Sequence, residues 1–165
     1  LAAKTGNGFM RRNALQSLKA INYWNPEFKD LLLRLLKDPY FEVRVAALEI
    51  LGENISEAEY ASIRATIQRT LRRGKFEEKA ACLRLIARKG NGADLERLRP
   101  LYLDSNSLLR EELLELLYVF YRRGLLTGDE IKKHIEQVLI NSYHLAPDFK
   151  VKSIIKRIYR EIDQP

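Results

Sequence analysis

The stretch from residue 38 to residue 52, which reads DPYFEVRVAALEILG, decides the fold. An Asp-Pro pair is typical of a turn, and a proline is tolerated near a helix start because its missing N–H leaves no helical bond unmade. After the turn, apolar residues recur at intervals of three and four, which is the period of a helix with one buried face. The stretch therefore predicts a turn followed by a helix over 41–52.

The centre of this stretch recurs along nearly the whole chain. A basic residue with small or apolar residues three and four positions later occurs in MRRNAL, VRVAAL, EKAACL, LREELL and, more loosely, VKSII. The first four basic residues stand 33, 35 and 31 residues apart; the five are Arg11, Arg44, Lys79, Arg110 and Lys152. A period in the thirties with two helices per unit indicates stacked helix pairs, because one pair cannot bury its own apolar face.

Residues 38–52 resemble the second half of a HEAT repeat, in which an Asp-Pro turn leads into a Val-Arg-x-x-Ala-x-x-x-Leu-Gly helix. The other copies in this chain lack the Asp-Pro turn. The resemblance implies an all-α fold, a right-handed armadillo-like α-solenoid of about four and a half HEAT-like repeats and about nine helices. Members of this family mostly offer curved binding surfaces, and a minority are nucleic-acid or cofactor-handling enzymes.

Apolar stripes of helical period run along the chain, and no segment shows the sustained alternation of a strand, so we predict no sheet. We expect helices over 9–22, 26–37, 41–52, 57–73, 76–89, 94–103, 107–123, 129–141 and 148–162.

Several helix ends carry their own signals. Ser56 with Glu59, and Thr127 with Glu130, have the spacing of capping boxes, and Asn25 precedes a proline as an N-cap does. Four glycines follow apolar helical patterns, where a left-handed residue commonly closes a helix; they are Gly52, Gly74, Gly90 and Gly124.

Length and composition limit the class of protein. The chain has 165 residues, with 29 Lys and Arg against 22 Asp and Glu, a formal charge of +7. This size predicts a single domain over 1–165, and since position 1 is Leu we expect a module of a larger protein. One cysteine allows no internal disulfide, no apolar run could cross a membrane, and no signal peptide opens the chain. We expect a cytoplasmic, intracellular protein.

The repeated basic residue has two interpretations. It can lie along the stack and pair with an acid of the next repeat, the acids at hand being Asp38, Glu42, Glu78 and Glu111. It can instead bind a ligand, because most of the excess positive charge falls on the second helix of each pair. In HEAT-like stacks these helices usually line the concave side. We favour the structural interpretation.

We expect the chain to bind a protein partner along that concave face. The alternative is nucleic acid held through its phosphates, with aromatic pairs such as Tyr40-Phe41 stacking on bases beside the cations. The candidate binding residues for either partner are Arg11, Arg44, Lys75, Lys79, Arg84, Arg110, Lys152 and Lys156.

Catalysis finds little support in the sequence. His134 and His144 stand ten residues apart with no Cys or second His beside them, so they do not form a metal site. Cys82 occupies a position that other repeats fill with small apolar residues. The acids at 111–115 suit a helix N-terminus, and no glycine-rich phosphate loop is present. We therefore predict no enzyme, no cofactor and no metal.

Overall fold

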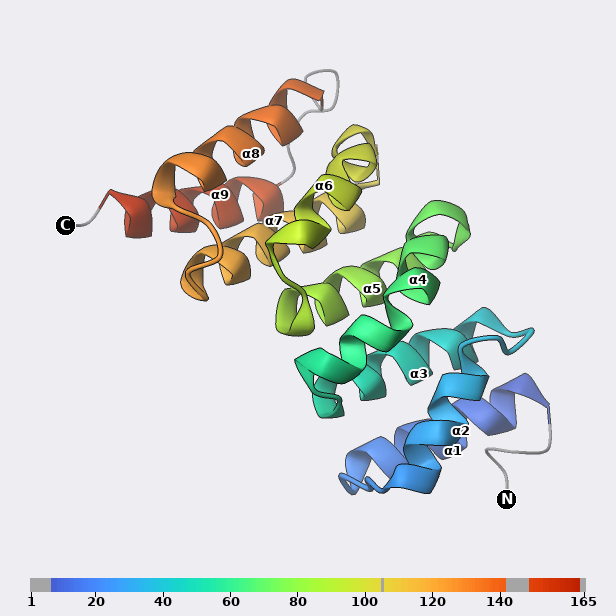
Figure 1. Ribbon diagram of the computed structural model, residues 1–165. Coiled ribbons are helices and arrows are strands. Elements are labelled where there is room, and N and C mark those ends of the chain that lie inside the picture. The colour runs from blue at the N-terminus through green and yellow to red at the C-terminus, as the bar shows by residue number, and fades with distance from the viewer. Residues whose placement is uncertain (1–6, 105, 142–148, 164–165) are drawn as a thin grey trace. The chain divides into compact units, whose positions relative to one another are not determined.

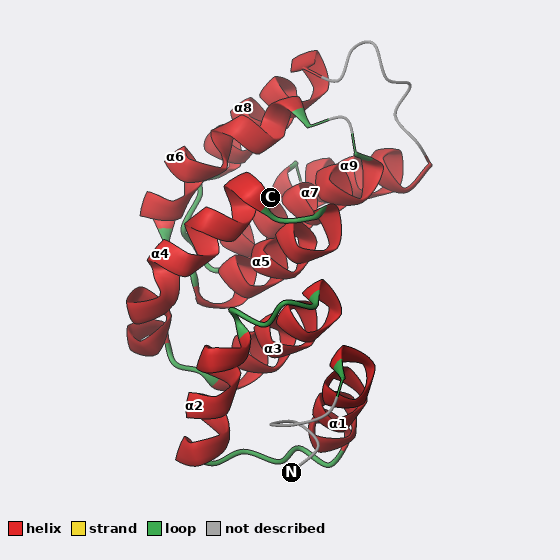
Figure 2. Ribbon diagram, turned by 90° about the vertical axis from the view of Figure 1, so that its right-hand side faces the viewer, coloured by secondary structure: helices red, strands yellow, loops and turns green. Residues whose placement is uncertain are grey.

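The computed structural model describes residues 7–104, 106–141 and 149–163. Within these ranges the chain is entirely helical, with no strand, and short loops join the helices (Figure 2). The elements are α1 (Gly8–Ala20), α2 (Pro26–Leu35), α3 (Phe41–Asn54), α4 (Glu57–Arg73), α5 (Phe76–Lys89), η1 (Gly92–Asp94), α6 (Leu95–Leu98), η2 (Arg99–Leu103), α7 (Ser107–Arg122), α8 (Gly128–Asn141) and α9 (Phe149–Ile162).

The predicted helices are confirmed to within about two residues at their ends, with one exception. The continuous helix expected over 94–103 is wrong. This segment consists of the four-residue helix α6 between two 3-10 turns, η1 and η2. Pro100 lies at the start of the second turn, and a proline there cannot donate the bond that would continue α6.

The predicted N-caps are confirmed. Asn25 accepts a hydrogen bond from the Phe28 amide at 2.7 Å. At Thr127, the hydroxyl accepts from the Glu130 amide at 3.3 Å, and the Glu130 carboxylate accepts from the Thr127 amide at 2.8 Å. Ser56 begins α4 with the corresponding capping box.

The glycine caps are confirmed only in part. Gly124 has a φ of +70°, as a left-handed closing residue requires, whereas Gly74 has a φ of −73° and Gly90 also lacks a positive φ. Gly52 lies inside α3, where an added Cβ would stand 3.3 Å from the Leu85 side chain. Its lack of a side chain therefore serves the close approach of α3 and α5.

The chain divides into two compact units, Leu1–Leu85 and Ile86–Pro165, and the boundary falls inside α5. In the first unit, α1 lies beside α3, and α2 packs against α3 (Figure 1). The small residues Ala47, Ala80 and Ala81 are buried among larger side chains, which lets the helices approach closely. The fully buried side chains of this unit include Leu15, Leu32, Val43, Leu51, Tyr60 and Ile67.

In the second unit, α7 contacts both α8 and α9, and η2 packs against α7 and α8 (Figure 1). The apolar residues Leu113, Leu114, Leu117 and Phe120 form one face of α7 and are completely buried. This face meets apolar residues of α8 and α9 in one core, whose members include Leu113, Leu117, Phe120, Ile131, Ile135 and Ile158. Among the described helices none is long and apolar enough to cross a membrane.

Candidate binding surfaces

In the first unit, ion pairs join α1 to the turn before α3, and α3 to α5. Arg11 of α1 donates two hydrogen bonds to the Asp38 carboxylate, at 2.7 and 2.9 Å. Arg44 of α3 donates two to the Glu78 carboxylate of α5, at 2.7 and 3.1 Å. Both pairs are bidentate, which is the strongest geometry for arginine and carboxylate. The structural interpretation of the repeated cation is therefore confirmed at these two positions.

The two carboxylates are buried, and their partners decide their ionisation. Burial alone would raise the pKa of Asp38, but hydrogen bonds from the Arg11 guanidinium and the Tyr40 amide hold that pKa below its ordinary value. Burial opposes the Glu78 charge in the same way. Hydrogen bonds from Arg44 and the Lys75 amide lower its pKa. Both groups are thus anions at neutral pH and act as fixed anchors between helices.

More exposed pairs continue the same pattern. Glu49 of α3 accepts contacts from Lys19 of α1 at 3.5 Å and from Arg84 of α5 at 3.1 Å. Lys29 of α2 lies 2.7 Å from Glu59 of α4. Exposed ion pairs of this kind contribute about 0–1 kcal/mol each, so they set the register of neighbouring helices more than they stabilise them.

These ion pairs reduce the number of candidate binding residues whose charge can bind a ligand. Arg11, Arg44 and Arg84 have their charges engaged within the first unit. The Lys75 ammonium lies 3.8 Å from the centroid of the Phe41 ring, and Lys79 is half-buried. Three of the eight candidates lie in the second unit. Arg110 is only 5% exposed, and its Nε has no hydrogen-bond partner within the described ranges, whereas Lys152 and Lys156 are exposed.

An exposed aromatic cluster lies at the start of α1 in the first unit. The Tyr40 ring is 49% exposed, yet it is fixed on two sides. The backbone of Gly8 lies so close that an added Cβ would overlap the ring, and the Arg11 guanidinium carbon is 5.5 Å from the ring centroid. Beside it, a cavity of about 290 Å³ is lined by Gly8, Phe9, Arg12, Tyr40 and Glu42. We call these five residues the aromatic site.

The sequence did not point to the aromatic site as a whole. The sequence predicts for Tyr40 only a role in stacking on bases, and it predicts no role for Phe9, which is 66% exposed. The available signal was the glycine at position 8, one helical turn before Arg11. It marks a place where the backbone must approach a ring from another element.

A second surface lies on α9. Its buried residues Val151, Ile154 and Ile158 face the core, and the exposed residues lie on the opposite side. These exposed residues include three basic side chains in a row. Only two of the three were predicted from the sequence as binding residues. The row is Lys152, Lys156 and Arg160, spaced by four residues, and Arg160 is the member not predicted.

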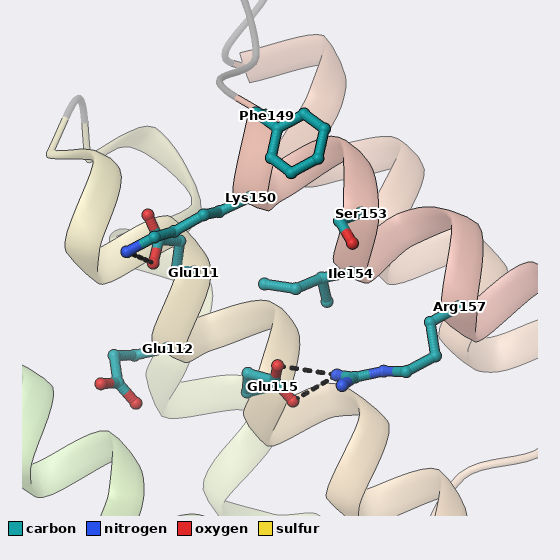
Figure 3. A pocket seen from close by; sticks show the side chains of 8 residues that line it. All are labelled: Glu111, Glu112, Glu115, Phe149, Lys150, Ser153, Ile154 and Arg157. Carbon is teal, nitrogen blue, oxygen red and sulfur yellow. Dashed lines mark hydrogen bonds and ion pairs between the residues drawn. The ribbon is translucent and has the colours of Figure 1, made fainter.

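The flank of α9 that faces α7 has a different character. A pocket of about 340 Å³ lies here, and Figure 3 shows Lys150 and Arg157 of α9 reaching across it toward acids of α7. Arg157 lies 2.6 Å from Glu115, and Lys150 lies 3.7 Å from Glu111. The cations of this flank are therefore used to join the two helices.

Two described side chains considered for catalysis, Cys82 and His134, are buried or hydrogen-bonded. Burial raises the pKa of the Cys82 thiol, so this side chain stays protonated. The Tyr102 hydroxyl lies 2.7 Å from Nδ1 of His134, burial raises the pKa of Tyr102 to about 12, and burial lowers the pKa of His134. His144 lies outside the described residues. In the part of the chain that the structure describes, no three His, Cys, Asp or Glu side chains gather as a metal site would require.

Comparison of the chain with protein-family models, with curated proteins and with solved structures finds no match.

Proposed function

We propose that this chain is a non-enzymatic helical-repeat scaffold that binds a protein partner, with the aromatic site as its principal docking point. The observation that carries the proposal is the fixed, half-exposed ring of Tyr40 between Gly8 and Arg11. An exposed aromatic ring usually loses side-chain freedom on binding. Here that loss has already occurred, so a partner gains apolar contact at a small entropic cost.

The composition of the aromatic site fits a protein partner. Interfaces between proteins are enriched in aromatic residues, methionine and arginine, and their hot spots are commonly Tyr, Trp or Arg. The site combines Phe9, Tyr40 and Arg12, and Met10 is exposed next to it. A bulky apolar side chain of the partner would enter the cavity, while Arg12 and Glu42 at its rim pair with polar groups nearby.

The finer fold belongs to the same proposal. We propose a right-handed HEAT-like α-solenoid of about four and a half repeats over 1–165, forming one module of a larger intracellular protein. Support comes from the order of the helices and from Arg11 and Arg44, which share a position in the sequence period and each pair with an acid close to the next basic residue of that period. In such a stack the partner would lie along the second helices, on the concave side.

The alternative partner, nucleic acid, draws on a different observation. Arg69, Arg72 and Arg73 are exposed together at the end of α4. Phosphate binding by such a group would weaken steeply between about 50 and 200 mM salt, whereas an aromatic docking site would respond little. The two candidates therefore differ in a property that one titration measures.

Selection of peptides from a displayed random library on the folded chain tests the proposal. Selected peptides should share a bulky apolar residue, and calorimetry should show that Tyr40→Ser weakens their binding by about thirtyfold, the loss typical of a hot spot. Ile21→Ser is the matched control, because Ile21 is exposed at the end of the same helix but does not line the cavity. Equal losses in the two variants, or selected peptides without an apolar residue in common, would contradict the proposal.

A further inference from the structure

Helix α9 presents three sides with different chemistry. One is apolar and buried, one carries the ion pairs to α7, and the third faces outward. Successive residues in a helix are rotated by about 100°, so residues four apart lie nearly in line. Lys152, Lys156 and Arg160 therefore form a row on the outward side. Phe149, at the start of the helix, is exposed next to this row, and its side chain also lines the pocket toward α7.

The three charged side chains of this row can bind a ligand. Within the described ranges, no hydrogen bond or ion pair joins Lys152, Lys156 or Arg160 to another residue. This distinguishes them from Lys150 and Arg157 on the same helix, which pair with acids of α7. Three like charges in a row repel one another, and an anion that bridges them relieves that repulsion.

Phe149 adds an apolar contact to the row. Its side chain is 85% exposed, the largest exposed fraction among the described large hydrophobic residues. Figure 3 shows its ring at the start of α9, among the side chains that line the pocket toward α7. An exposed aromatic side chain next to available cations suits a ligand that has both an apolar and an anionic part.

We propose that the outward side of α9, formed by Phe149, Lys152, Lys156 and Arg160, binds an extended acidic segment of a partner protein. We call these four residues the α9 row. The inference rests on the proposed function in one respect, since it takes the occupant to be a protein, but it uses no residue of the aromatic site.

The spacing of the row fits such a segment. Residues four apart in a helix are separated by about 6 Å along its axis. In an extended chain, alternate residues point to the same side and stand about 6.6 Å apart. Carboxylates at every second residue of the segment thus meet successive cations of the row. An apolar residue at one end of the segment covers Phe149.

The surroundings of the row favour a narrow peptide over nucleic acid. The pocket beside it holds three acids, Glu111, Glu112 and Glu115, against the two cations Lys150 and Arg157. A duplex is broader than one helix face and would bring phosphates toward these carboxylates. A single strand gains much of its affinity from stacked bases, and Phe149 is the one exposed ring on this side of α9 within the described residues.

The test uses a fluorescein-labelled peptide of about ten residues, with one Phe followed by Glu at alternate positions. A matched peptide carries Gln in place of every Glu. Fluorescence anisotropy measures the affinity of both for the chain at about 50 mM salt and at about 200 mM salt. We expect the Glu peptide to bind more tightly than the Gln peptide, with an affinity that falls as salt rises.

The deciding variant is Lys152→Glu/Lys156→Glu/Arg160→Glu. It should weaken binding of the Glu peptide by at least about tenfold, because three attractive contacts become repulsive. The matched control is Arg69→Glu/Arg72→Glu/Arg73→Glu, which makes the same change of charge at exposed positions of α4.

Phe149→Ser should weaken binding by about threefold, the loss of a partly covered ring. Circular dichroism shows whether each variant is folded, and Lys156→Glu alone replaces the triple variant if that one is not.

Equal losses in the α9 variant and the α4 control would overturn the proposal, since net charge alone would then explain binding. Tighter binding of a labelled single-stranded or duplex oligonucleotide than of the Glu peptide, lost in the α9 variant, would assign the row to nucleic acid instead. Tyr40→Ser should leave binding of the Glu peptide unchanged. Failure at the aromatic site and failure at the α9 row are therefore separate results.

Discussion

The start of α3 and the outward side of α9 both carry basic residues at repeated positions, but their surroundings differ. Arg44 is held by two hydrogen bonds to the buried carboxylate of Glu78 on α5. Lys156 faces away from its neighbouring helices and meets no acid in the part of the chain that the structure describes. A repeated cation is thus structural where a neighbouring helix brings an acid to it, and available for binding where none does.

Lowering the pH should have the largest of the expected effects on the stability of the folded chain. The pKa values of Asp38 and Glu78 are lowered in the folded chain, and the pKa of Glu59 falls from 4.5 to about 2, chiefly because of its hydrogen bond with Lys29. A lowered folded pKa contributes stability above the unfolded value, and this contribution is lost as pH falls through the folded value. We expect urea midpoints to decrease slightly between about pH 7 and 5, because the unfolded chain protonates His134 before the folded chain does, and to decrease steeply between about 4.5 and 2. A midpoint unchanged down to pH 3 would contradict this assignment.

Removing one buried acid should have the next largest effect. Glu78→Ala leaves Arg44 without its partner, and we expect a loss of about 2–3 kcal/mol in the free energy of unfolding, measured by urea denaturation. Arg44→Met/Glu78→Leu should recover most of this loss, because the costly state is the single uncompensated charge. Glu115→Ala is the exposed control, for which the loss should stay below about 1 kcal/mol. Equal losses of stability in Glu78→Ala and Glu115→Ala would show that the buried and the exposed ion pair contribute equally.

The smallest expected effect concerns the exposed ring rather than the ion pairs. Gly8→Ala places a methyl group against the Tyr40 ring and forces it to move. We expect a loss of about 1–2 kcal/mol, measured by thermal unfolding, together with weaker binding of peptides at the aromatic site. Gly92→Ala is the control, because an added Cβ there meets nothing within 4 Å. An unchanged Gly8→Ala variant would show that Tyr40 is not held by its contact with Gly8.

Most of the helices and their N-caps could be predicted from the sequence, because each depends on a local period or on a residue type at a fixed short spacing. Asn25 and Ser56 act on amides three residues away, so their role is visible in a short window. The break in the helix expected over 94–103 depends on Pro100 and was within reach of the same reasoning.

The availability of each candidate cation could not be predicted in this way. Arg11 finds its acid 27 residues away and Arg44 finds its acid 34 residues away, so pairing is decided by how helices pack. Arg110 shares their position in the repeat, yet it is buried. The exposure of Phe9 and Tyr40 likewise depends on which elements pack over them, and the period of the sequence does not indicate this.

The three contacts of Asp38 have a consequence for the dynamics of the first unit. Its carboxylate holds α1 through Arg11 and holds the turn before α3 through the Tyr40 amide, so the aromatic site exists only while α1 is docked. Brief local opening of α1 would therefore dismantle the site without unfolding the rest of the unit. A partner bound at Tyr40 would in turn slow hydrogen exchange of the α1 amides, including those far from any contact with it.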